Sequence, residues 1–265
     1  MQILRTLTLA LAATFTLTTA SSAQNIPFTE LDRFEARLPK TLAYDPTTCS
    51  LWMTWRTHVI ANTSLKGTPL ATVDAGSGSI SAVTAGPNGV FALKTGPSVA
   101  KVVDGTLNDF IPLPQPNTRY SSLYGGVVLP DGTLVLSFRD SRTLAAFPPE
   151  GETLIALPFD LPGDLRDLAY DPATNTLFGI MRAFRRGMER PVEMLVMFDR
   201  NLTVIGYSDL AAFGVGPTGI TIQPETGDLF VSFLDLGQIN GTILRLKIED
   251  PTLYPPDALR PASTC

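Results

Sequence analysis

Residues 167–181 read DLAYDPATNTLFGIM: a short apolar strand, a turn rich in Asp, Pro and Asn, and a second strand with aromatic and β-branched residues. Pro fixes φ in such a turn, and Asn or Gly accepts the positive φ that a tight hairpin requires. The pattern returns as TLAYDPTTCSLWMTW (41–55), AVTAGPNGVFAL (82–93), GVVLPDGTLVLSF (126–138) and GITIQPETGDLFVSF (219–233). The chain is therefore built on a repeated β-hairpin.

Each hairpin is followed by two weaker strand patterns, for example within 59–73, 143–157 and 193–208. The repeats recur at intervals of about 40 to 50 residues, and four strands per repeat are typical of a propeller blade. We predict an all-β fold, a β-propeller of five four-stranded blades. Another blade number and other β architectures are the alternatives.

The last repeat has only three clear strand patterns, at 218–223, 228–234 and 242–248. A propeller must join its ends, because an open ring leaves strand edges unpaired. The segment Phe34–Leu38 precedes the first repeat and could supply the missing outer strand. We therefore predict that an N-terminal strand closes the ring.

The first 23 residues are typical of a signal peptide. Arg5 gives a positive start, residues 7–17 form an apolar core too short to cross a bilayer, and 21–23 are small residues suited to cleavage. An N-terminal membrane anchor is the alternative. We predict a signal peptide over 1–23, a single propeller domain over 24–265 with a Pro-rich tail at 251–265, and a secreted protein, extracellular or periplasmic, with no membrane contact after cleavage.

Export gives the two cysteines a specific meaning. Cys49 lies in the turn of the first repeat and Cys265 is the final residue of the sequence. A pair of thiols in an oxidising compartment usually forms a disulfide where geometry permits. We predict a Cys49–Cys265 bond that pins the tail to the first repeat, with two unpaired thiols as the alternative.

Composition excludes several classes of protein. Charged residues make up 17% of the chain, apolar residues 44%, and the net charge is −5. This composition does not suit a disordered chain or a coiled coil. An acidic chain also lacks the basic surface that binds nucleic acid, so we predict no nucleic-acid partner.

The aligned repeats place equivalent residues around the channel. The residues that begin the inner strands and those that end the second strands lie on one face of a propeller, and many of them are basic. A basic mouth concentrates anions, and Arg binds carboxylate or phosphate with two hydrogen bonds. The candidate ligand-binding residues are Lys40, Arg56, Tyr124, Arg139, Asp140, Arg166, Asp167 and Arg182. The alternative is that these Arg side chains pair with neighbouring acids, as the sequences Arg166–Asp167 and Arg139–Asp140 suggest.

Known catalytic motifs are missing from the sequence. It contains no G-x-S-x-G elbow, no H-E-x-x-H and no phosphate-binding loop. Two cysteines and one histidine, His58, cannot build a common zinc site. We therefore predict no metal site and no cofactor, and assign no catalytic residue.

The repeats LAYDPATNTLFGI (168–180) and ITIQPETGDLFVSF (220–233) resemble those of secreted β-propellers of the broad NHL/YVTN and gluconolactonase-like group. The resemblance implies the propeller fold, usually with six or seven blades. In lactonase-type members it also implies a divalent metal held in the channel by Glu, Asn and Asp. Here the equivalent positions carry one carboxylate, Asp167, and a hard cation needs several oxygen ligands.

These observations lead to two functional hypotheses. The first is an exported, non-catalytic propeller that binds a small anionic ligand or a protein partner through its channel face. The second is a hydrolase or lactonase-like enzyme with its site at the channel, using Asp167 or Asp140. Whether the chain is an enzyme stays open at this point.

Overall fold

The structure is a computed structural model. It describes residues 24–76, 78–94, 98–113, 123–138, 143–149, 155–158, 161, 163–183, 192–199, 201–214, 216–234, 240–251, 254–255 and 258–262.

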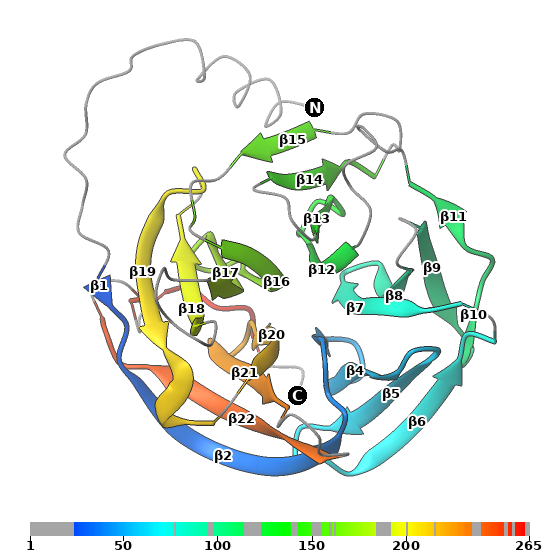
Figure 1. Ribbon diagram of the computed structural model, residues 1–265, viewed down its shortest axis with the longest axis horizontal. Coiled ribbons are helices and arrows are strands. Elements are labelled where there is room, and N and C mark those ends of the chain that lie inside the picture. The colour runs from blue at the N-terminus through cyan, green and yellow to red at the C-terminus, as the bar shows by residue number, and fades with distance from the viewer. Residues whose placement is uncertain are drawn as a thin grey trace.

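Five sheets stand around a common axis, and each contains one of the repeated hairpins as its two inner strands (Figure 1). Blade 1 comprises β3 (Leu42–Asp45), β4 (Ser50–Arg56), β5 (Val59–Ser64) and β6 (Pro69–Asp74). Blade 2 comprises β7 (Ile80–Gly86), β8 (Gly89–Lys94) and β9 (Ser98–Val103), with the short β10 (Thr106–Leu107) and β11 (Ile111–Pro112) both paired to β9. Blade 3 comprises β12 (Leu123–Val128), β13 (Leu134–Phe138), β14 (Thr143–Phe147) and β15 (Ile155–Pro158).

Blade 4 comprises β16 (Gly163–Asp171), β17 (Thr176–Ala183), β18 (Val192–Phe198) and β19 (Val204–Asp209). The short 3₁₀ helix η1 (Leu210–Ala212) follows it. Blade 5 comprises β20 (Pro217–Gln223), β21 (Asp228–Phe233) and β22 (Asn240–Ile248). The predicted five-bladed propeller is therefore confirmed, and the usual blade number of the resembled group does not apply to this chain.

The ring is closed by an N-terminal strand, as predicted. β2 (Phe28–Arg37) pairs antiparallel with β22 from Phe28 opposite Ile248 to Arg37 opposite Asn240. The strand begins earlier than the predicted segment. Its first half is charged and exposed, so the sequence there lacks the apolar pattern that marks the other strands. Just before it, β1 (Gln24–Asn25) runs parallel to β19, which the sequence did not predict. One N-terminal segment thus joins blade 5 to blade 4 (Figure 1).

The turns of the hairpins explain the repeated Pro, Asn and Gly. Asp45 and Asp171 each accept a hydrogen bond from the backbone N–H two residues later and from a Thr hydroxyl three residues later. The last turn residue then takes a positive φ, which is 60° at Asn175 and 78° at Gly227. Cys49 occupies the same position in blade 1, with a φ of 52°.

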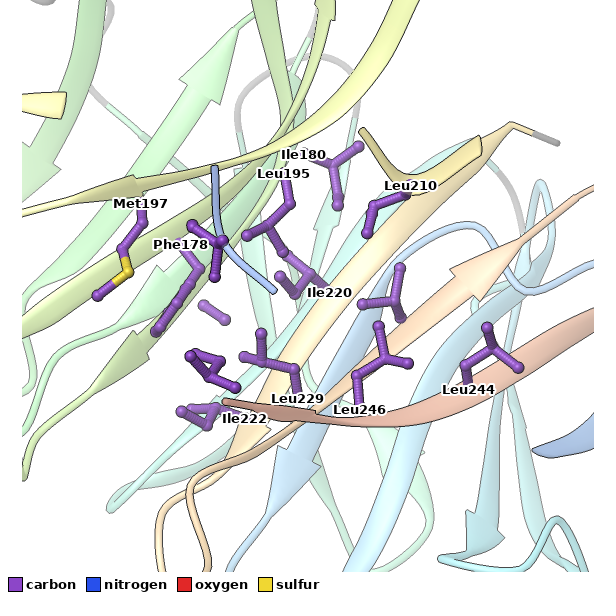
Figure 2. Packing of buried hydrophobic residues seen from close by; sticks show 14 of the residues in the cluster. Phe178, Ile180, Leu195, Met197, Leu210, Ile220, Ile222, Leu229, Leu244 and Leu246 are labelled. Carbon is purple, nitrogen blue, oxygen red and sulfur yellow. The ribbon is translucent and has the colours of Figure 1, made fainter. Parts of the chain in front are cut away.

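The described residues form five buried hydrophobic clusters, each between two neighbouring blades. The largest joins blades 4 and 5, where Phe178 and Leu195 face Ile220 and Leu246 (Figure 2). The aromatic residues that recur on the second strands are buried in different clusters of this kind, for example Trp52, Phe178 and Phe230. Packing between blades therefore uses the apolar faces that the repeat alternation places on both sides of each sheet.

The chain after β22 crosses the turn face of the ring, and we call residues 254–262 the C-terminal strap. The ring of Tyr254 packs edge-on against Phe178, with centroids 5.9 Å apart, and its hydroxyl donates to the Asp171 carboxylate. Arg260 makes two hydrogen bonds to the same carboxylate, of 3.2 and 3.0 Å, and one of 3.0 Å to the carbonyl of Pro224. The Asp171 side chain is fully buried, so this ion pair anchors the strap to blade 4.

Candidate ligand site at the channel mouth

Four of the inner strands carry a β-bulge near their first residue, which the register shifts locate in β7, β12, β16 and β20. The bulged residues are Ser81, Tyr124, Arg166 and Thr218, and Lys40 stands at the corresponding place just before β3. A bulge inserts an extra residue that the ladder does not pair, which turns its side chain away from the sheet. The alignment of the repeats therefore identified structurally equivalent positions at one end of the channel.

The residues that follow the bulges approach one another closely. An added Cβ at Gly125 would lie 2.5 Å from the carbonyl oxygen of Arg166 and 2.6 Å from Asp167 Oδ1. A Cβ at Gly219 would lie 2.8 Å from the carbonyl oxygen of Lys40. Neighbouring inner strands therefore meet backbone to backbone, and the carboxylate of Asp167 occupies space that a side chain at Gly125 would need.

Asp167 is fully buried and joins three blades. Its Oδ2 accepts hydrogen bonds from the backbone N–H of Leu42 in blade 1, at 3.1 Å, and of Ile220 in blade 5, at 2.9 Å. Burial raises the pKa of Asp167 well above its ordinary value, while the nearby N–H groups of Ile220, Leu42, Leu168 and Gly126 act in the opposite direction. This carboxyl group therefore links the inner strands of three blades, and it is not open to a ligand.

The two described arginines of the predicted site converge on one acid. Glu193 Oε1 lies 3.2 Å from Nη1 of Arg166 and 3.7 Å from Nε of Arg182. Asp164, Arg182 and Glu193 lie side by side on β16, β17 and β18, because Arg182 is directly opposite both acids in the register. The side chain of Arg166 reaches Glu193 from the bulge in β16. Two acids and two arginines therefore gather at one end of blade 4.

The surroundings of Arg166 disfavour the charged form of its guanidinium. Burial lowers the pKa below its ordinary value and the neighbouring Arg182 lowers it further, while Glu193, Tyr124 and Asp164 raise it. The Nε atom of Arg166 is buried and makes no hydrogen bond among the described residues. A guanidinium can donate five N–H bonds, so the unbonded Nε leaves donor capacity at Arg166.

The other predicted residues divide into three groups. Lys40 is exposed beside β3, and Tyr124 is half-buried on β12 of the adjacent blade. Arg56 ends β4, and its side-chain placement lies outside the described structure. Arg139 and Asp140 also lie outside the described residues. Of the eight predicted residues, the structure thus brings Arg166 and Arg182 together, with Tyr124 near enough to act on the pKa of Arg166.

Ion pairing among the arginines occurs, but with a different partner than predicted. Arg166 does not pair with the adjacent Asp167, because that side chain points to the N–H groups on the axis. Its partner Glu193 was missed by the sequence reading. The register of the β17–β18 hairpin could have revealed it, since it places Glu193 directly across from Arg182, where opposite charges attract.

No group of three metal-binding side chains is found among the described residues. Within the same residues, no helix has the length and apolar character needed to cross a bilayer.

Comparison with known proteins gives a likeness of fold. No protein-family model matches the chain, and no curated protein matches it in sequence. The structure is similar to the crystal structure of a Myxococcus xanthus glutaminyl cyclase, with a TM-score of 0.63 and 13% identity over 86% of this chain and 100% of that one. At this identity the likeness establishes a shared five-bladed propeller fold and no specific function.

Proposed function

We propose that the chain is an exported, non-catalytic propeller that binds a small anionic ligand, a carboxylate or phosphate, through Arg166 and Arg182. The observation that carries the proposal is the convergence of both guanidiniums on a single oxygen of Glu193. A ligand carboxylate or phosphate would supply an acceptor to Arg166, whose Nε makes no hydrogen bond among the described residues, and would offset the repulsion between the two cations.

The geometry also favours retention of a bound anion. The Arg166 and Glu193 side chains are only 22% and 14% exposed, so ions in solution screen their charges less than those of a surface pair. The exposed Lys40 adds positive charge near the same mouth. Tyr124 offers a hydroxyl from the adjacent blade, which could orient the ligand across the boundary between blades 3 and 4.

A thermal-shift measurement of the chain without residues 1–23 tests this proposal. Phosphate and succinate should raise Tm relative to chloride at equal ionic strength, because a ligand that binds only the native state stabilises it. At about 100 times Kd the gain is roughly 2.7 kcal/mol, which corresponds to a shift of several degrees for a chain of this size.

The variants for this test are Arg166→Ala with Arg182→Ala, and Arg33→Ala as the matched control. Arg33 is a surface arginine on β2 that is ion-paired to Glu30, so its loss removes one cation far from the site. The double variant should lose the ligand-induced shift and the control should keep it. Equal shifts in the double variant and the control, or no shift in the unmodified chain, would refute anion binding at this site.

A second candidate is catalysis at the same mouth, and one observation favours it: the similar solved structure is an enzyme, a glutaminyl cyclase. Incubation with a synthetic glutaminyl peptide, followed by mass spectrometry, separates the two candidates. Product formed by the unmodified chain and lost in Glu193→Gln would support the enzyme. An unchanged peptide, together with a phosphate-induced rise in Tm, would support the binding protein.

A further inference from the structure

A cavity of about 370 Å³ lies on the turn face, at the end of the channel opposite the arginine cluster. All five inner strands contribute to its wall, and so does one proline from each hairpin turn. These prolines are Pro46, Pro87, Pro130, Pro172 and Pro224. Protein interiors leave few voids larger than a water molecule, and this volume is in the range of small-molecule sites. The cavity is therefore larger than a packing defect.

The wall of the cavity is mostly apolar. Besides the prolines it includes Leu42, Val127, Leu168 and Ile222, which come from four different blades. Water is held poorly in such a space, because a buried water needs several polar partners. An apolar molecule would gain by replacing that water.

One side of the cavity is polar and carries a carboxylate. Glu225 lines it, and the Oε2 atom of this residue is shielded from solvent and makes no hydrogen bond within the described part of the chain. The hydroxyl of Tyr44 is hydrogen-bonded to the same carboxylate, and burial, the charge of Glu225 and this hydrogen bond raise the pKa of that hydroxyl. The Oε2 atom still has no donor among the described residues, and a buried acceptor without a donor is unfavourable, so this oxygen is suited to a ligand that brings a donor.

The C-terminal strap forms part of the wall but leaves the volume open. Pro261 and Ala262 line the cavity, and they follow Arg260, whose guanidinium is bound to Asp171 and to the Pro224 carbonyl. The guanidinium of Arg260 is therefore already bonded elsewhere. The space beside Glu225 is thus not filled by the described part of the strap.

We propose that this cavity is a binding site for a small organic amine with an apolar body, whose ammonium group binds Glu225 while the body lies among the prolines and aliphatic side chains. A charged donor suits an ionised acceptor better than a hydroxyl does, and the rings of Tyr44 and Tyr170 in the same wall attract cations. The site is separate from the anion site, because its wall contains neither Arg166 nor Arg182.

Phenethylamine, 2-phenylethanol and phenylacetate are the probes for this proposal. They share an apolar body and differ in the group that would meet Glu225. Isothermal titration and thermal shift of the whole chain should show phenethylamine binding at least tenfold more tightly than 2-phenylethanol, and no binding of phenylacetate. Equal affinities for the amine and the alcohol, or no binding of the amine, would overturn the proposal.

Two variants assign the binding to the cavity. Glu225→Gln should reduce phenethylamine affinity at least tenfold, whereas Glu249→Gln, which removes an exposed carboxylate outside the cavity wall, should not change it. Ala85→Leu fills part of the cavity from a half-buried position and should weaken both the amine and the alcohol. If Glu225→Gln does not fold, Ala85→Leu still decides, because unchanged amine affinity in that variant would place binding elsewhere and refute the site.

Discussion

At the residue scale, the carboxylate of Asp167 accepts backbone hydrogen bonds from two other blades at the centre of the ring. Asp167→Ala would leave the N–H groups of Leu42 and Ile220 buried without partners. Each unpaired donor costs about 1–3 kcal/mol, so we expect a loss of about 2–5 kcal/mol in the free energy of unfolding. Urea denaturation measures it, and a loss below about 0.5 kcal/mol would show that Asp167 does not hold the blades together.

The same residue should make stability depend on pH. Because burial raises the native pKa of Asp167 above the ordinary 3.8, the native state keeps a proton that the unfolded chain releases. Its contribution is fully present below about pH 3.8 and is lost as pH rises toward the native pKa. Asn does not titrate, so the stability of the unmodified chain relative to Asp167→Asn should fall as pH rises from about 4. Parallel urea titrations at several pH values measure this difference, and a constant difference would contradict the raised pKa.

Single residues also show what the sequence could and could not predict about the site. The alignment of repeats found Tyr124 and Arg166 as equivalent positions, because a bulge recurs at the same point of four of the five hairpins. It could not predict that Asp167 turns inward while Arg166 reaches Glu193, since adjacent residues diverge at a bulge. That choice depends on contacts between blades, which no local pattern contains.

At the scale of elements, a buried ion pair between Arg260 and Asp171 is one of the contacts that hold the C-terminal strap. Arg260→Ala would leave the Asp171 carboxylate, which is fully buried, without its cation. Breaking such a pair costs on the order of 3 kcal/mol. We expect a loss of this size in urea, with faster hydrogen exchange at residues 254–262.

Arg33→Ala is the control for this variant. The Arg33–Glu30 pair is exposed on β2, with 52% and 33% of the two side chains accessible, and such pairs contribute within about 0.5 kcal/mol. If both arginine variants lose the same stability, the strap is not anchored through Asp171.

The strands themselves were predictable where apolar alternation marked them. The hairpins and most outer strands follow from the repeats, and so does the need for a closing strand. The full length of β2 did not follow, because residues such as Glu30, Asp32 and Arg33 face solvent and show no strand pattern. The parallel contact of β1 with β19 is too short for any sequence signal.

At the scale of the whole molecule, the predicted Cys49–Cys265 bond remains a prediction, because Cys265 lies outside the described residues. Two observations support it. Cys49 takes a positive φ at a position where other blades use Asn or Gly, and Ala262, three residues before Cys265, lines the same cavity as Pro46, three residues before Cys49. A Cys at such a position is better explained by a bond than by the turn.

Cys265→Ser should therefore destabilise the chain when it is oxidised. The bond would close a loop of roughly 200 residues, for which chain entropy gives on the order of 5 kcal/mol before any strain. Urea denaturation with and without reductant measures the difference, which should vanish under reducing conditions. Thiol titration that finds two reactive cysteines in the native protein would exclude the bond.

The closing strand also constrains how the molecule is made. β2 is synthesised before blades 1 to 4, whereas its partner β22 is synthesised after them. A nascent chain can assemble individual hairpins, but β2 has no lasting partner until β22 has been made. The ring therefore closes only after all five hairpins exist, and until then its exposed strand edges are the places where the unfinished protein is most open to proteases, chaperones and pairing with other copies.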